Sequence, residues 1–171
     1  MARYRTIGIG MDYSPTSKQA VQWTVDHLVR SGDTVILIHV VSGKSDHGEK
    51  VLWGDSGSPL IPLYEFMEMN LRVRYGLNPD KEVFSILDTA SRDKQIKVLA
   101  KVYWGDPREK LCEAVANLKL DSLVVGNRGL GPLKRTLLGS VSNYVVNNIT
   151  CPVTVVRATS GSKPKTQLNY N

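Results

Sequence analysis

Five short apolar segments alternate along the chain with segments of helical periodicity, and this alternation restricts the possible folds more than any other feature. The apolar segments are predicted to be strands at Arg5–Met11, Thr34–Val41, Ile96–Val102, Ser122–Val125 and Pro152–Val156. Strands that alternate with helices form a parallel sheet with right-handed crossovers. The sequence therefore predicts an α/β fold: a doubly wound, Rossmann-like, five-stranded parallel sheet in the order 3-2-1-4-5, with helices on both faces.

Helix signals separate the predicted strands. Ser14-Pro15 has the form of an N-cap followed by proline in the first turn, and Asn78-Pro79 repeats this pattern. The segment Asp106–Glu109 resembles a capping box. The helical periodicity that begins at Pro62 fits either two helices or one helix kinked at the second proline signal. Residues Ser42–Leu60 are predicted to form a long surface loop.

Length and composition fit one globular domain. The chain has 171 residues, of which 42% are hydrophobic and 22% are charged. We predict a folded domain over residues 1–157 and a loose tail over residues 158–171, which are rich in Ser, Gly, Lys and Pro. No apolar run is long enough to span a membrane. We therefore expect a cytoplasmic protein, with a nuclear location also open.

The charge pattern permits contact with phosphates but does not indicate nucleic-acid binding. The net charge is +6, and the basic residues are scattered with no block of like charges. Cys112 and Cys151 are too few and too far apart for a metal quartet or a disulfide framework. They are expected to be reduced and mostly buried, while a redox switch is the alternative. His39 lies in an apolar strand and is expected to be a core residue.

A ligand site is predicted where the strand order reverses, because the carboxyl ends of parallel strands form a crevice there. Gly10–Ser14 and Gly126–Ser140 meet at this point, and the loop after Val41 adjoins them. Glycines at 126 and 129 would let the backbone approach a ligand closely and adopt positive φ. Gly139-Ser140 would open a helix, whose free N–H groups favour an anion.

Two common nucleotide motifs are excluded. The chain has no Gly-Lys-Ser/Thr sequence, so it carries no Walker P-loop. Gly8-Ile9-Gly10 is followed by Tyr13 where a dinucleotide fingerprint needs its third glycine. A Rossmann NAD site is therefore not expected.

The segment Gly126-x2-Gly129-x9-Gly139-Ser140 resembles the nucleotide-binding signature of the ATP-binding universal stress proteins. Met11–Ser14 after the first strand and Cys151–Val153 before the last strand are similar to the same family. The resemblance covers roughly residues 3–157, and the stretch Leu52–Pro62 looks like the plant branch. The resemblance implies an adenine nucleotide, ATP or AMP, with Mg²⁺ or Mn²⁺ held through the phosphates when an ion is present.

The resemblance also implies roles for individual residues. Asp12 would hold the ribose hydroxyls, while Val40 or a neighbour would meet the adenine through backbone groups. The remaining positions would line the ribose or bind phosphate oxygens. The full set of predicted nucleotide-binding residues is Gly10, Met11, Asp12, Ser14, Val40, Gly126, Arg128, Gly129, Gly139, Ser140 and Val141. Two other interpretations stay open: Asp12 could cap the first helix, and the first two motif glycines could simply form a turn.

The predicted function is that of a nucleotide-dependent stress-response binding or sensor module. We predict no catalytic residues, because no nucleophile with a base and no paired carboxylates accompany the glycine segment. Slow ATP hydrolysis and a redox-responsive chaperone oligomer are the alternatives. A homodimer is expected through residues 153–156, an apolar strand at the sheet edge.

Overall fold

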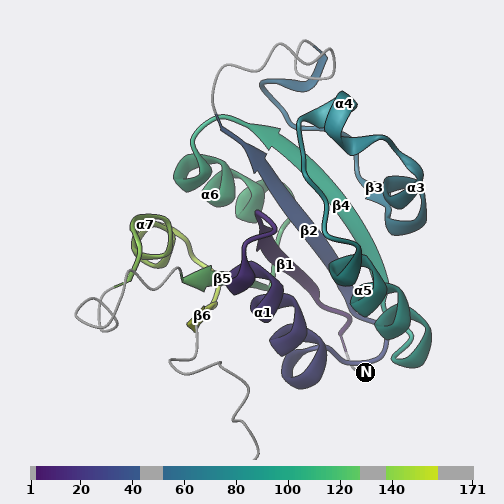
Figure 1. Ribbon diagram of the computed structural model, residues 1–171. Coiled ribbons are helices and arrows are strands. Elements are labelled where there is room, and N and C mark those ends of the chain that lie inside the picture. Colours follow the sequence, from purple (N-terminus) through teal and green to yellow (C-terminus); the bar gives the residue numbers. More distant parts are fainter. Residues whose placement is uncertain (1–2, 43–51, 128–137, 158–171) are drawn as a thin grey trace, which may run out of the picture.

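A computed structural model describes residues 3–42, 52–127 and 138–157 of the chain. Its centre is a twisted sheet of six strands in the order β3-β4-β2-β1-β5-β6 (Figure 1). The strands are β1 (Thr6–Met11), β2 (Thr34–Val41), β3 (Ile61–Pro62), β4 (Lys97–Trp104), β5 (Ser122–Asn127) and β6 (Val153–Arg157). All pairs are parallel except β3 with β4. The predicted order of the five parallel strands is confirmed, and the order reverses between β1 and β5.

The predicted count of five strands is one short, because β3 adds an antiparallel strand at one edge of the sheet. Ile61 lies opposite Ala100, and Pro62 lies opposite Leu99. A two-residue strand is too short to display alternation, and Pro62 belongs to a segment that we assigned to a helix. Just before it, Ser58 donates its N–H to the carbonyl of Val102 at 2.8 Å. Part of the predicted long loop thus covers the β4 edge.

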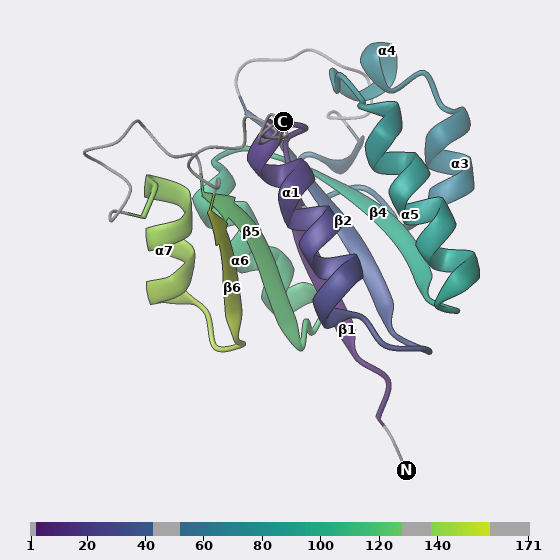
Figure 2. The same ribbon diagram turned by 60° about the horizontal axis from the view of Figure 1, so that its bottom comes forward.

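Helices cover both faces of the sheet, as predicted. One face carries α1 (Pro15–Trp23), its π-helical extension η1 (Thr24–Leu28), α3 (Leu63–Glu68), α4 (Leu71–Tyr75) and α5 (Lys81–Asp93). The other face carries α6 (Pro107–Asn117) and α7 (Ser140–Asn148). Figure 2 shows α1 and α5 lying side by side along the first of these faces.

The middle segment contains three helices, where the sequence allowed two helices or one kinked helix, and one predicted cap is also corrected. Separate helices α3, α4 and α5 occupy this segment, and α4 ends at Gly76, whose φ is 69°. The cap of α5 is Asp80, whose side chain accepts the N–H of Glu82 at 2.9 Å. Asn78-Pro79 therefore precedes the helix without capping it. Asp106 caps α6 through the N–H of Arg108.

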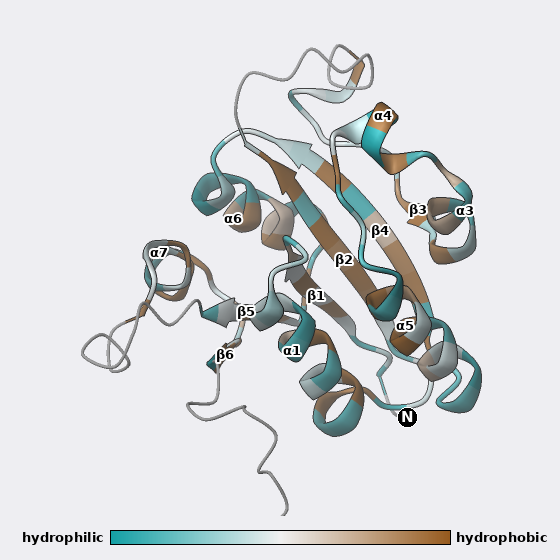
Figure 3. Cartoon of the chain, in the orientation of Figure 1, coloured by the Kyte–Doolittle hydropathy of each residue, from teal (hydrophilic) through white to brown (hydrophobic). Residues whose placement is uncertain are grey.

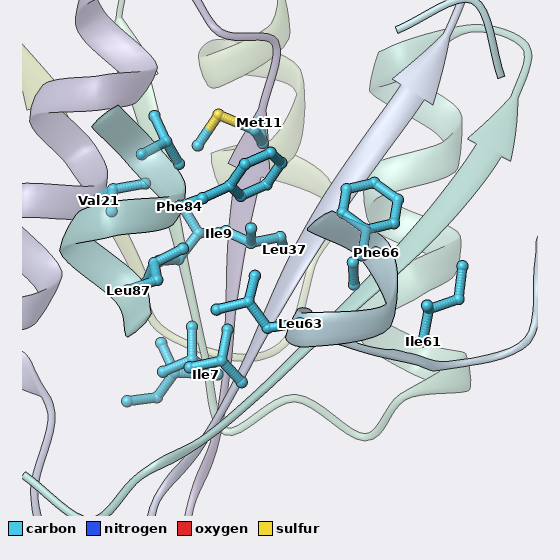
Figure 4. Packing of buried hydrophobic residues seen from close by; sticks show 14 of the residues in the cluster. Ile7, Ile9, Met11, Val21, Leu37, Ile61, Leu63, Phe66, Phe84 and Leu87 are labelled. Carbon is cyan, nitrogen blue, oxygen red and sulfur yellow. The ribbon is translucent and has the colours of Figure 1, made fainter. Parts of the chain in front are cut away.

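The core consists of two apolar clusters, one on each side of the sheet. Figure 4 shows how Ile7, Ile9 and Leu37 of the central strands pack against Phe84 and Leu87 of α5. The hydropathy colouring of Figure 3 shows apolar strands between helices whose outer surfaces are polar. Both faces of β1 and β2 are therefore covered, as is usual for central parallel strands.

Candidate functional site

A cleft of about 440 Å³ opens at the carboxyl ends of β1, β2 and β5, where the strand order reverses. Its volume lies in the range of small-molecule sites, roughly 300–1,000 Å³. The described residues that line it come from both segments predicted to meet there and from three helices. They are Gly10, Met11, Asp12, Ser14, Thr16, Ser17, Ile38, Val40, Ser42, Pro107, Leu111, Val125, Gly126, Asn127, Gly139, Ser140, Val141 and Ser142.

The structure brings together every predicted site residue that it describes. These residues all line the cleft: Gly10, Met11, Asp12, Ser14, Val40, Gly126, Gly139, Ser140 and Val141. Arg128 and Gly129 lie outside the described residues. The predicted convergence of the strand exits is therefore observed for the described part of the motif.

Sequence reasoning missed the wall that α6 contributes. Pro107 and Leu111 line the cleft, although they stand in a helix that follows β4 rather than β1 or β5. It also missed Ile38 and Val125. Their side chains lie on the face of the sheet to which a Cβ on Gly10 would point. Ile38 lies directly opposite Gly10 in the β1–β2 ladder, a pairing that the predicted strand order alone does not give.

The exit from β1 presents Asp12 to the cleft. Oδ1 of Asp12 accepts the N–H of Ser14 at 2.9 Å, which forms a tight local turn. Ser14 is the N-cap of α1, and its Oγ accepts the N–H of Ser17 at 3.3 Å. Asp12 therefore does not cap the first helix, and this alternative to its predicted role is removed.

Gly126 plays a different part from the predicted one. It lies inside β5, and it is absent from the glycines with positive φ. A Cβ at this position would lie 2.7 Å from the backbone carbon and oxygen of Thr16 and 2.9 Å from the nitrogen of Ser17. The missing side chain thus allows the first turn of α1 to pack directly on β5. The predicted positive φ at Gly126 is wrong, because this residue belongs to β5 and the close contact that requires a glycine comes from a distant helix.

The N-terminus of α7 faces the cleft without a side-chain cap. Its N-cap is Gly139, and no side chain in the described part of the chain caps this end. The N–H of Gly139 donates to Oδ1 of Asn127 at 2.5 Å, which ties α7 to the end of β5. The neighbouring helices α1 and α6 are capped by Ser14 and Asp106. The first-turn N–H groups of α7 therefore offer a site for an anion.

The cleft combines an apolar floor with a polar rim. Ile38, Leu111 and Val125 supply buried apolar surface. Hydroxyl side chains surround it at Ser14, Thr16, Ser17, Ser42, Ser140 and Ser142. Asp12 is the one ionisable side chain among the described lining residues. Such a surface suits a ligand with a flat apolar part and several hydrogen-bonding groups.

The remaining candidate groups lie apart from the cleft. Cys112 and Cys151 are free and half-buried, and burial raises the pKa of both thiols. Reactive cysteines have lowered pKa values, so the two sites lack that activation.

Within residues 3–42, 52–127 and 138–157, no cluster of three or more His, Cys, Asp or Glu side chains could hold a metal ion. No described helix has the length and apolar character needed to cross a membrane.

Comparison with known proteins places the chain in a family. The family model of the universal stress protein family matches residues 3–157. The chain belongs to this family. It is 36% identical over 163 residues to universal stress protein PHOS32 of Arabidopsis thaliana, and the match covers 90% of this chain and 64% of PHOS32. It is 35% identical to universal stress protein PHOS34 of the same plant, and that match covers 90% of this chain and 62% of PHOS34. The chain thus spans less than two thirds of these relatives.

Solved structures of other universal stress proteins share the fold. One is a family member from Arabidopsis thaliana with AMP bound: its TM-score is 0.57 and its identity is 23%, with 95% of this chain and 97% of that chain covered. Another is a universal stress protein in complex with cAMP. Its TM-score is 0.55 and its identity is 22%, with 91% of this chain and 98% of that chain covered. The doubly wound arrangement of this chain is therefore that of the family.

Proposed function

We propose that this universal stress protein binds an adenine nucleotide, ATP or AMP, in the cleft and acts as a nucleotide-dependent module of the stress response. The observation that carries the proposal is the position of the Asp12 carboxylate and the uncapped start of α7 in one cleft at the switch point of the sheet. The AMP and cAMP complexes of family members with the same fold support it.

The parts of a nucleotide match the parts of the cleft. Asp12 accepts hydrogen bonds from the ribose hydroxyls, because a carboxylate is an acceptor that can receive both. The phosphates bind at Gly139, Ser140 and Val141, where N–H groups and the helix dipole favour negative charge. Arg128 and Gly129, which lie outside the described residues, are proposed to contribute to phosphate binding, with a Mg²⁺ or Mn²⁺ ion held through the phosphates. The nucleotide-binding domain is residues 1–157, with the tail outside it.

The adenine lies on the apolar floor and is read by the backbone of Val40. The carbonyl of Val41 accepts the N–H of Gly105, which follows β4. Backbone groups of successive strand residues point in opposite directions, so the carbonyl of Val40 points towards β1. The β1–β2 ladder ends at the pair of Met11 and His39, and Val40 lies past it. A carbonyl there accepts the adenine amino group, whereas guanine presents a carbonyl oxygen at the same position.

We also propose that two copies of the chain associate through β6. Among the described strands, β6 pairs with β5 alone and forms one edge of the sheet. The other edge is covered by the segment that contains β3. An edge strand with unpaired backbone groups can pair with its own copy across a two-fold axis.

Isothermal titration calorimetry tests the nucleotide site. ATP and AMP should bind to the wild-type protein, and GTP should bind more weakly. Asp12→Ala should weaken ATP binding by about 1–3 kcal/mol, the range for a lost hydrogen bond to a charged group. The affinity for 2′-deoxy-ATP should fall less than the affinity for ATP in this variant. Equal binding of ATP by wild type and Asp12→Ala would refute the assignment of the sugar site.

A further inference from the structure

The backbone of Tyr13 adopts a conformation that its surroundings must hold. Its φ is 59°, in the left-handed region that disfavours residues with a Cβ. The other described non-glycine residues with positive φ are Gln95 and Lys119. Both follow the ends of helices, where a left-handed residue is common. Tyr13 instead precedes a helix, directly after Asp12, so its conformation needs a different explanation.

A hydrogen bond in the core anchors the side chain of Tyr13. Its hydroxyl lies 2.9 Å from Nε2 of His39. The Tyr13 ring contacts the His39 ring with centroids 5.3 Å apart, and it meets the edge of Phe84 at 6.1 Å. Figure 4 shows Phe84 beside Met11, the last residue of β1. Tyr13 is therefore held on the α5 side of the sheet, away from the cleft that Asp12 lines.

His39 is unusual for its position. It is fully buried in β2, where its neighbours Ile38 and Val40 are apolar. Burial lowers the pKa of His39 to about 3, so the imidazole is neutral under physiological conditions. Burial and the nearby charge of Asp80 raise the pKa of Tyr13. The bond thus joins two neutral groups, and an apolar residue at position 39 would fill the core without needing a partner.

The turn from β1 into α1 is fixed at both ends. Met11 is the last residue of the ladder with β2, and its Sδ accepts a hydrogen bond from Oγ of Ser17 at 3.5 Å. Ser14 is fixed as the N-cap of α1. Tyr13 is the residue between Asp12 and the Ser14 N–H that the Asp12 carboxylate accepts, so its backbone conformation sets where that N–H lies relative to Asp12.

We propose that Tyr13 and His39 form a positioning pair that holds the left-handed turn and thereby aims Asp12 at the sugar hydroxyls of the nucleotide. This inference rests on the proposed nucleotide site. Neither residue lines the cleft, so the pair acts through Asp12 and touches no ligand. A pair that only filled the core would affect all nucleotides equally, whereas a positioning pair affects those with both ribose hydroxyls.

The test is calorimetric titration of the full chain with ATP and 2′-deoxy-ATP. Tyr13→Phe keeps the ring and removes the hydroxyl. We expect its affinity for ATP to fall roughly three- to ten-fold, as for one net hydrogen bond, while its affinity for 2′-deoxy-ATP changes less than two-fold. Tyr103→Phe is the matched control, because it removes another buried tyrosine hydroxyl from a residue that does not line the cleft. It should keep the wild-type ratio of the two affinities.

A second variant keeps the test independent of how well Tyr13→Phe folds. His39→Leu removes the other partner and matches the apolar character of β2, and it should lower the affinity ratio by the same factor. Combining both changes should cause no further loss. If Asp12→Ala loses the ribose preference while Tyr13→Phe and His39→Leu retain it, the positioning pair is refuted and the nucleotide site stands. A wild-type protein without ribose preference would refute the sugar site itself, and the positioning pair with it.

Discussion

Adding one methyl group at Gly126 should separate α1 from β5. The new Cβ would lie 2.7 Å from the backbone carbon and oxygen of Thr16, whereas ordinary contacts begin at 3.4 Å. The first turn of α1 must therefore withdraw by about 0.7 Å, since backbone atoms cannot rotate out of the way. Overpacking typically costs about 1–3 kcal/mol, and we expect Gly126→Ala to reach the upper end of this range.

Gly10→Ala provides the matched control, because Gly10 also lies in a central strand and lines the same cleft. A Cβ at this position would meet Cγ1 of Val125 at 3.3 Å and Cδ2 of Leu111 at 3.6 Å. Both are ends of side chains that can adjust. The lower backbone entropy of alanine in the unfolded chain offsets part of the cost. The change in the free energy of unfolding should stay within about 1 kcal/mol.

Urea denaturation followed by circular dichroism measures both variants. The midpoint should fall clearly for Gly126→Ala and little for Gly10→Ala, with the same slope as wild type. ATP binding should also weaken in Gly126→Ala, because Thr16 and Ser17 line the cleft and move with α1. Equal stability of the two variants would refute the conclusion that close packing of α1 on β5 requires a glycine at 126.

Two further predictions concern stability and assembly. Asp33→Asn should destabilise the fold at pH 7 by less than the roughly 3–5 kcal/mol of a fully buried ion pair, since its partner Arg5, at 2.6 Å, is 26% exposed. Burial raises the pKa of Asp33, but hydrogen bonds from Arg5 and from the Arg30 backbone outweigh this and lower it below 3.8. The stabilisation is therefore present above pH 3.8 and is lost as the pH falls through the folded-state pKa. The denaturation curves of wild type and variant should converge in acid. A difference in stability that stays constant with pH would contradict this. Val155→Pro should give a folded monomer in sedimentation equilibrium. The carbonyl of Pro152 faces β5, so the N–H of Val155 points to the open edge, where it pairs with no described strand and is available to a second copy. A Val155→Pro dimer as tight as wild type would exclude the β6 interface.

The parallel part of the fold follows from local patterns. The five long strands were predictable because each is apolar and separated from the next by helix signals such as Ser14-Pro15 and Asp106. The start of α7 at Ser140 was predictable from its preceding glycine. The convergence of the strand exits then follows from the topology alone, because parallel strands place their carboxyl ends at one edge.

What the sequence could not supply depends on contacts between distant segments. The strand β3 forms because β4 offers an open edge, and two residues carry no periodicity of their own. The α6 wall of the cleft at Leu111 depends on how that helix lies across the sheet. The role of Gly126 depends on the distance of α1, a hundred residues earlier in the chain. Each of these features is set by packing in three dimensions and leaves no local signal.

Three departures from local rules lie together near the carboxyl ends of the central strands. Stability alone would favour glycine or asparagine at Tyr13, an apolar residue at His39 and a serine or aspartate cap at Gly139. The other left-handed non-glycine residues, Gln95 and Lys119, follow helix ends, where this conformation is common, and α5 has its Asp80 cap. Residues that cost stability persist where function requires them. These conflicts lie beside the proposed nucleotide site, and they support the proposal that Tyr13 and His39 hold Asp12 in place.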